Sequence, residues 1–248
     1  MSISYIVCAA GRGTRTREIT SQVPKPFLKL NGKTLLQRSV ESLPIRAEDQ
    51  LIVILLREHE SWVSEYGLEG SDYIFLDEVT GGQAETAYKA YNQLRYRKAA
   101  IFNSDTFFSQ KDLYELMKND NIDGLIPCSR QSGHEWSFCR VVPEGGSYRA
   151  VEVAEKKRIS DFCSVGFYYF RDIQDLFIPL AEKLNQQLGQ SDNAKAGELY
   201  VAPFYQSLIL EGKKIFAPLV DDFKPMGSVE QIEKYWGVSL EQMRQQQR

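Results

Sequence analysis

The sequence is poor in the side chains that most often bind metals or act as nucleophiles. It contains two histidines, His59 and His134, and four cysteines in 248 residues. No two cysteines form a Cys-x-x-Cys pair, and neither histidine has zinc-ligand spacing with them. We therefore predict buried free thiols and a reducing compartment, the cytoplasm. Both histidines lie in polar segments that we interpret as loops, so we do not expect a Ser/His/Asp or Cys/His catalytic set.

Long hydrophobic runs and a strong net charge are also absent. No apolar run approaches the about 20 residues of a membrane span, and residues 1–5 lack the charges of a signal peptide. The net charge is −3, from 30 Lys+Arg and 33 Asp+Glu, which excludes nucleic-acid binding through bulk charge. No linker divides the chain, so we expect a single domain over residues 1–248 with neither nucleic acid nor membrane as partner.

The small net charge hides a segregation of charged residues. Residues 11–40 carry seven basic side chains and one acidic side chain, Glu18, and sum to +6, whereas the rest, with 23 basic and 32 acidic, sum to −9. The seven are Arg12, Arg15, Arg17, Lys25, Lys29, Lys33 and Arg38. A short cationic segment on an otherwise acidic chain indicates one site for a small anion rather than a track for a polyanion.

The first part of the chain alternates between short apolar runs and helical patterns. The runs are apolar throughout, which is typical of parallel strands covered on both faces. We predict such strands at Ser4–Ala10, Leu51–Leu56, Tyr73–Leu76 and Ala99–Asn103. Between the last two, helical spacing connects Ala84, Ala87, Tyr88, Tyr91 and Leu94. This alternation predicts an α/β fold with a doubly wound parallel sheet.

The second half is predicted to add a mixed sheet and further helices. Strands are expected at Trp136–Val142, Tyr148–Ala154 and Asp161–Phe170, with a hairpin turn at residues 143–146. Helices are expected at about residues 172–188, kinked or shortened by Pro179, and at about residues 197–210. A strand near Lys214–Leu219 precedes a helix that begins at about Ser228 and continues to Met243, and residues 245–248 are expected to fray.

A glycine-rich turn directly follows the first predicted strand. In Gly11-Arg12-Gly13-Thr14-Arg15 the glycines let backbone N–H groups approach a ligand closely, which favours an anion. The turn is not a dinucleotide fingerprint, because Thr16 stands where that pattern needs its last glycine. Nor is it followed by a Walker A loop, because Phe27 stands where the first glycine of that loop would be.

Lys25, which lies between Pro24 and Pro26, adds a second cation to this turn. We expect the intervening loop to fold over a triphosphate, with Arg15 at the outer phosphates and Lys25 at the phosphate that is attacked. The alternative is an ordinary tight turn with solvated arginines.

Asp105 follows the predicted strand Ala99–Asn103, at the edge of the sheet where α/β folds bind ligands. A carboxylate there suits Mg²⁺ that bridges phosphates, so we predict a magnesium site at Asp105. The alternative is an aspartate that caps a turn by bonding to its own backbone.

Taken in their order along the chain, these motifs resemble those of sugar-phosphate nucleotidylyltransferases, also called NDP-sugar pyrophosphorylases. The resemblance begins with Ala9–Arg15 and Pro24-Lys25-Pro26 and extends from residue 5 to about residue 240. Further matching segments are Gly81–Thr86, Asn103-Ser104-Asp105, Glu155-Lys156, Ser164–Tyr168 and Gly227–Glu230. The resemblance implies a Rossmann-like fold of the glycosyltransferase-A type, in which a mixed, mainly parallel sheet is flanked by helices.

The resemblance also implies a reaction. Nucleoside monophosphate passes from an NTP to a sugar 1-phosphate or similar small phosphorylated acceptor, pyrophosphate is released, and the product serves capsule or other surface-polysaccharide synthesis. Arg15 and Lys25 are then catalytic, Mg²⁺ is the cofactor, Lys156 holds the acceptor phosphate and Glu155 an acceptor hydroxyl. The implied nucleotide-binding residues are Ala10, Gly11, Gly13, Thr14, Gly82, Gln83 and Glu85, and the acceptor-binding residues are Glu155, Lys156 and Gly166.

The match is incomplete at the second metal ligand. The family often has an aspartate two residues before the late Gly-Thr/Ser pair, where this chain has Pro225. Asp221 or Asp222 is an alternative ligand, and both are equally consistent with a solvated turn. The segment 198–200 is similar to an acceptor-side helix of the family, but equally to a plain buried helix.

The nucleobase, the acceptor and the oligomeric state stay open. Gln83 offers a donor and an acceptor to a pyrimidine edge, and an ionised Glu85 suits the amino group of guanine or cytosine, but both equally suit the first turn of a helix. Two other functions remain. One is a glycosyltransferase of the same broad fold, although Asn103-Ser104-Asp105 lacks the first Asp of an Asp-x-Asp motif. The other is a nucleotide-binding regulator without turnover.

Overall fold

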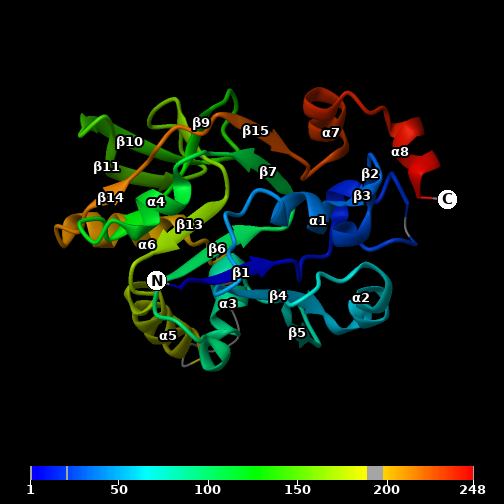
Figure 1. The fold of residues 1–248 in the computed structure, drawn as a ribbon, viewed down its shortest axis with the longest axis horizontal. Helices are drawn as coiled ribbons and strands as arrows, with labels where there is room; N and C mark the ends of the chain where they lie inside the picture. Colours follow the sequence, from blue (N-terminus) through cyan, green and yellow to red (C-terminus); the bar gives the residue numbers. More distant parts are fainter. Residues whose placement is uncertain (1, 21, 189–197, 248) are drawn as a thin grey trace.

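The computed structural model describes residues 2–20, 22–188 and 198–247, which form a large mixed sheet flanked by helices (Figure 1). The sheet has 11 strands in the order β5-β4-β1-β6-β13-β8-β14-β11-β10-β12-β9. They are β1 (Ser4–Cys8), β4 (Gln50–Leu56), β5 (Asp72–Leu76), β6 (Ala99–Asn103), β8 (Gly124–Leu125), β9 (Cys128–Arg130), β10 (Ser137–Glu144), β11 (Ser147–Glu155), β12 (Phe162–Ser164), β13 (Phe167–Phe170) and β14 (Ile215–Phe216). Two small ladders pair β2 (Lys29–Leu30) with β3 (Lys33–Thr34), and β7 (Thr106–Ser109) with β15 (Asp222–Pro225).

The helices lie on both sides of this sheet (Figure 1). In chain order they are α1 (Leu35–Val40), α2 (Glu60–Tyr66), α3 (Gln83–Tyr88), α4 (Leu113–Lys118), α5 (Gln174–Leu188), α6 (Ala202–Leu210), α7 (Val229–Trp236) and α8 (Leu240–Gln246). Short 3₁₀ helices are η1 (Thr14–Thr16), η2 (Lys25–Phe27), η3 (Arg57–His59) and η4 (Tyr91–Gln93). The helix predicted from Ala84 to Leu94 is therefore α3 followed by the separate turn η4.

The first half forms the predicted parallel core. β1 pairs in parallel with β4 and β6, and β4 pairs in parallel with β5. Ile6 of β1 belongs to a core cluster with α3, α5 and α6, whereas Tyr5 and Val7 pack on the opposite face with α1 and α4. Burial of both faces explains why these strands are apolar throughout. The predicted mixed α/β sheet flanked by helices is confirmed.

The predicted strand Asp161–Phe170 is in fact two strands with different neighbours. β12 pairs with β9 and β10, whereas β13 pairs with β6 and β8. The break includes Gly166, whose φ of +81° is a conformation that glycine adopts without strain. The predicted hairpin is confirmed, because β10 and β11 are antiparallel around the turn at residues 145–146.

The C-terminal helices depart from the predicted pattern. Ser228 caps α7 as expected, but α7 ends at Gly237 with a φ of +65°, and Ser239 then caps α8. The apolar spacing therefore continues across two helices instead of one. Pro179 lies inside α5, which continues to Leu188, so Pro179 does not shorten this helix. The helix expected from residue 197 begins at Ala202, and residue 197 itself lies outside the described residues.

The end of the chain is held in place, so the prediction of a frayed tail was wrong for residues 245–247. The Gln247 side chain accepts a hydrogen bond from the Lys29 N–H and donates one to the Lys29 carbonyl, both at 2.8 Å. Gln246 accepts from the Asn31 N–H at 2.6 Å. These hydrogen bonds connect the end of α8 to β2, which follows Lys25 in the chain. Arg248 lies outside the described residues.

The structure also bears on the predictions made for the cysteines and for membrane-spanning helices. Cys128, Cys139 and Cys163 are buried free thiols, as predicted, and Cys8 is a half-buried one. Burial raises the pKa of Cys163 to about 12, so its thiol is protonated at neutral pH. Within residues 2–20, 22–188 and 198–247, no helix is both long and apolar enough to cross a bilayer.

His59 lies in the core, and its interpretation as a loop residue was wrong. It ends η3, is 5% exposed and meets the ring of Phe27 edge-on. Its Nδ1 atom has no hydrogen-bond partner in the described part of the chain. Burial lowers the pKa of His59, and the nearby Glu58 opposes that shift. His59 thus supports η2, the helix that begins with Lys25, as a neutral ring.

We expect His59 to make the fold sensitive to mild acid. Its pKa is lower in the folded than in the unfolded chain, so between about pH 7 and pH 5 the unfolded chain binds more protons and stability falls as the pH falls. His59→Phe should flatten this part of the melting-temperature profile. The exposed His134→Phe is the control and should leave the profile unchanged. Equal profiles for wild type and His59→Phe would contradict the prediction.

Candidate functional site

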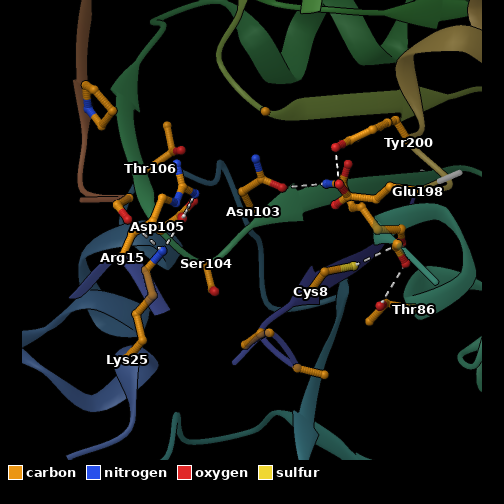
Figure 2. A pocket seen from close by; sticks show the side chains of 18 of the residues that line it. Cys8, Arg15, Lys25, Thr86, Asn103, Ser104, Asp105, Thr106, Glu198 and Tyr200 are labelled. Carbon is orange, nitrogen blue, oxygen red and sulfur yellow. Dashed lines mark hydrogen bonds and ion pairs between the residues drawn. The ribbon is translucent and has the colours of Figure 1, made fainter. Parts of the chain in front are cut away.

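A cavity of about 770 Å³ lies at the carboxyl ends of β1 and β6. Parallel sheets commonly bind ligands at this edge. In Figure 2, Arg15, Lys25 and Asp105 lie on one side of the view and Glu198 and Tyr200 on the other. We call the first group, with Arg12, the cationic side. The acidic side consists of Glu135, Glu155, Lys156, Glu198 and Tyr200, all of which line the same cavity.

The glycine turn forms the floor of the cationic side. Residues 9–15 all line the cavity, so Ala10, Gly11, Gly13, Thr14 and Arg15 lie together as the sequence predicts. Gly13 has a φ of +60°, and a Cβ atom added there would lie 2.6 Å from the Lys25 Cβ. Only glycine therefore lets the turn lie against Lys25. A Cβ atom added to Gly11 would meet nothing within 4 Å, which leaves open space above the turn.

Lys25 connects three distant segments of the chain. Its Nζ donates a hydrogen bond to Asp105 Oδ2 at 2.5 Å and another to the Gly227 carbonyl at 3.2 Å. The Arg15 guanidinium lies 4.0 Å from the same carboxylate oxygen. Burial by itself would raise the pKa of Asp105, but the charge and hydrogen bond of Lys25, together with Arg15, hold that pKa below its usual value. Asp105 is therefore ionised at neutral pH.

Asp105 suits a divalent cation that arrives with phosphate groups. Mg²⁺ in proteins is often bound through one or two carboxylates, and phosphate oxygens and waters complete its coordination. Among the residues described, no group of three His, Cys, Asp or Glu side chains could hold a metal ion. The donor set thus fits Mg²⁺ shared with a phosphate ligand, but not an ion held by the protein alone.

The alternative ligands Asp221 and Asp222 are not brought to this point. In the β7–β15 ladder, Pro225 lies opposite Thr106, whereas Asp222 lies opposite Ser109, about 10 Å farther along the strand. Asp222 pairs with Lys224 at 3.3 Å, and neither aspartate lines the cavity. Pro225, by contrast, does line the cavity.

The start of α3 brings Gln83 to the cavity but not Glu85. The Gln83 amide donates a 2.6 Å hydrogen bond to Asn103 Oδ1, and both residues line the cavity. Glu85 folds back over its own turn, where it accepts from the Gly81 N–H at 2.7 Å and pairs with Lys89 at 3.4 Å. Gly82 lines the cavity beside Gln83. Glu85 therefore lies in the first turn of a helix, which was the alternative to binding the nucleobase.

Glu155 belongs to a buried polar chain on the acidic side. It accepts a hydrogen bond from the Ser137 hydroxyl, which in turn lies 3.2 Å from the Tyr168 hydroxyl. Burial raises the pKa of Glu155, an effect that the Ser137 bond and Lys156 oppose. Gly166, the third predicted acceptor residue, also lines the cavity, and a Cβ atom there would lie 2.4 Å from the Asn103 amide.

Lys156 is held by Glu198 and Tyr200, which come just before α6 in the chain. Its ammonium group donates to the Tyr200 hydroxyl, lies 4.4 Å from the centre of the Tyr200 ring and 3.8 Å from Glu198 Oε2. The Tyr200 hydroxyl donates to the same carboxylate. The hydrogen bond from Lys156 to Tyr200 is the main reason that the pKa of Lys156 is raised. Glu198 and Tyr200 precede α6 and are not helical, which differs from both interpretations of this segment.

Glu135, Trp136, Ser137 and Tyr168 are among the cavity residues that were not predicted as site residues from the sequence. Trp136 and Ser137 appeared only as the beginning of a strand, and Tyr168 as part of another. No local pattern distinguishes them, because tertiary contacts bring them to the cavity: Ser137 lies opposite Glu155 in the β10–β11 ladder, and its hydroxyl is 3.2 Å from that of Tyr168 in β13.

A search for known families matches residues 4–196 to a family model described as nucleotidyl transferase. Among solved structures, the nucleoside-diphosphate-sugar pyrophosphorylase from Vibrio cholerae RC9 has a TM-score of 0.75 to this chain. It is 27% identical, and the match covers 93% of this chain and 98% of that one.

Curated relatives give a similar result. The bifunctional protein GlmU of Sulfurovum sp. (strain NBC37-1) is 26% identical over 246 residues, which cover 92% of this chain and 52% of that protein. The 2-C-methyl-D-erythritol 4-phosphate cytidylyltransferase of Vibrio vulnificus (strain CMCP6) is 27% identical over 134 residues, 54% of this chain and 53% of that protein. The chain thus spans about half the length of these two relatives.

Proposed function

Because the chain belongs to the nucleotidyl transferase family, we propose that it transfers a nucleoside monophosphate from an NTP to a small phosphorylated acceptor and releases pyrophosphate. The observation that carries this proposal is the contact of Lys25 with Asp105 beside the glycine turn. A cation fixed next to open space and a backbone turn is what a triphosphate requires.

In the proposed reaction, an oxygen of the acceptor phosphate attacks the α-phosphorus of the NTP. A new O–P bond forms, the bond between the α-phosphorus and its bridging oxygen breaks, and pyrophosphate carries the electron pair away. All reacting groups are anionic, so the protein must mainly align them and offset their charge. We assign Lys25 to the α-phosphate, and Arg15 with the backbone of Gly11–Thr14 to the β- and γ-phosphates. Asp105 would hold Mg²⁺, which would supply further positive charge at the phosphates.

For the acceptor, we propose that Lys156 binds the phosphate and Glu155 a hydroxyl group. Burial raises the pKa of Glu155, and its carboxylate oxygens can accept a hydrogen bond from such a hydroxyl group. Gly166 lets the acceptor approach the strand closely. For the nucleotide, we assign Ala10, Gly82 and Gln83 to the base, and the cytidylyltransferase among the relatives makes CTP the first nucleotide to test. We place the reaction in the cytoplasm, in the synthesis of a surface-polysaccharide precursor.

The experiment is an assay of pyrophosphate release. The protein is incubated with Mg²⁺, each of CTP, UTP, dTTP, GTP and ATP, and a panel of phosphorylated acceptors, and pyrophosphate is measured with a coupled enzyme. We expect release that needs both an NTP and an acceptor. Nucleotide binding without release in any combination would contradict the proposal and favour a regulator, and turnover of an NDP-sugar alone would favour a glycosyltransferase.

A further inference from the structure

The acidic side of the cavity already binds an ammonium group, that of the protein's own Lys156. The group lies over the Tyr200 ring at 4.4 Å from its centre and 3.8 Å from the Glu198 carboxylate, and it bonds to the Tyr200 hydroxyl. An aromatic face, a carboxylate and a hydroxyl acceptor are the three contacts by which proteins recognise a primary ammonium ion. Figure 2 shows Tyr200 and Glu198 together on this side of the view.

Lys156 can leave this position. Its side chain is 54% exposed and that of Glu198 is 57% exposed, so the pair is not locked into the core. The backbone of Lys156 is fixed independently, by a 3.0 Å bond from its N–H to the Trp136 carbonyl and by a φ of +52°, which L-residues seldom adopt. Unusual backbone of this kind is commonly retained where a side chain must be aimed.

The charge on this side is unsuited to an acceptor that is only anionic. Glu135, Glu155 and Glu198 line it with one cation, Lys156, so its formal charge is −2. If Lys156 turns to the acceptor phosphate, Glu198 loses its ion-pair partner inside the cavity. An acceptor that carries a positive charge of its own restores this ion pair with Glu198.

We propose that the acceptor carries a protonated amine as well as its phosphate, and that this amine replaces the Lys156 ammonium between Glu198 and Tyr200. This inference rests on the proposed function. Lys156 is displaced from its resting contacts by the amine and becomes available to the phosphate of the same molecule. Glu198 and Tyr200 are therefore specificity residues, and a phosphorylated primary amine is the substrate class.

The test uses acceptor pairs that differ only in the amine. We compare 2-aminoethyl phosphate with 2-hydroxyethyl phosphate, and glucosamine 1-phosphate with glucose 1-phosphate, and we measure kcat/KM for pyrophosphate release. The amine of at least one pair should be preferred by about tenfold, which is what one cation–π contact with one ion pair supplies. Phosphocholine serves as a third probe, and its lack of N–H groups should make it poorer than 2-aminoethyl phosphate.

Variants separate recognition from damage to the fold. Glu198→Gln and Tyr200→Leu should bring kcat/KM for each amine close to that of its hydroxyl partner and so remove the preference for the amine. Glu182→Gln, on the exposed face of α5 and outside the cavity, is the matched control and should keep the preference. Melting temperatures check that each variant is folded.

Two failures can be told apart. Hydroxyl acceptors that react as well as their amines, or a preference that survives in both Glu198→Gln and Tyr200→Leu, would overturn this inference and leave the proposed function standing. The proposed function itself fails if no acceptor, with or without an amine, gives pyrophosphate with any NTP.

Discussion

Replacing Lys25 with Met is expected to lower kcat for pyrophosphate release by about 10²–10³-fold, the usual cost of removing one fixed group that stabilises charge in a transition state. Lys25 is 15% exposed and its ammonium group is held by Asp105 and the Gly227 carbonyl. No reorganisation is therefore needed when the charge develops. Met keeps the length of the side chain and removes the charge. Nucleotide affinity, measured by calorimetry, should fall much less than kcat, because Arg15 and the turn remain.

Lys33→Met is the matched control for Lys25→Met. Lys33 belongs to the same positively charged segment 11–40, but it pairs with Glu41 and does not line the cavity. Its loss should leave kcat within about threefold of the wild type, since surface ion pairs contribute little. A kcat for Lys25→Met close to that of Lys33→Met would remove Lys25 from the catalytic machinery.

The loss of Lys25 also leaves the Asp105 carboxylate without its closest cation. Asp105 is 20% exposed, so part of the effect of Lys25→Met could come from an unpaired charge rather than from catalysis. The double variant Lys25→Met/Asp105→Asn removes both charges and should recover the melting temperature of the wild type. Because Asp105 is also the residue proposed for Mg²⁺, Asp105→Asn alone is the reference for activity, and if Lys25 acts on the phosphate the double variant should be less active than Asp105→Asn. Equal activity of these two variants would show that Lys25 only neutralises Asp105.

The cationic side of the cavity could be predicted because its signals are local. The turn at residues 11–15 follows a strand directly, and Lys25 is marked by a proline on each side. A glycine-rich turn after a parallel strand points to the sheet edge whatever the rest of the chain does. The structure adds what spacing cannot give, namely that Lys25, Asp105 and Gly227 meet at one point although up to 202 residues separate them.

The acidic side could be predicted only in part, because it is assembled by tertiary contacts. Lys156 was expected to face an acceptor, but its contact with Tyr200 depends on the tertiary contact between the segment before α6 and the start of α3. His59 shows the same limit for the core: its neighbours in sequence are charged, yet the η3 turn directs its ring against Phe27. Likewise, apolar spacing continues past Gly237, and the αL conformation there, with the Ser239 cap that follows, divides α7 from α8.

The contact between the segment before α6 and the start of α3 leads to the second large expected effect, a loss of stability when Gly82 is replaced. Gly82 has a φ of +149°, and a Cβ atom there would lie 2.5 Å from both the N and O atoms of Leu199. Leu199 is 4% exposed and is tied to this turn by two backbone bonds, from its N–H to the Gly81 carbonyl and from the Ala84 N–H to its own carbonyl. Neither backbone can shift without breaking these bonds.

We expect Gly82→Ala to destabilise the fold by about 3 kcal/mol, at the upper end for one strained residue, and to lower the melting temperature by about 6–12 °C. Gly70→Ala is the control without a close contact: its φ of +74° is also one that L-residues seldom adopt, but a Cβ atom there meets nothing within 4 Å. It should cost only about 1 kcal/mol. Equal losses in calorimetric melts would mean that backbone conformation alone, and not the contact with Leu199, makes glycine necessary. A larger loss at Gly82 is expected, and because Leu199 lies between Glu198 and Tyr200, it should be accompanied by a weaker preference for amine acceptors.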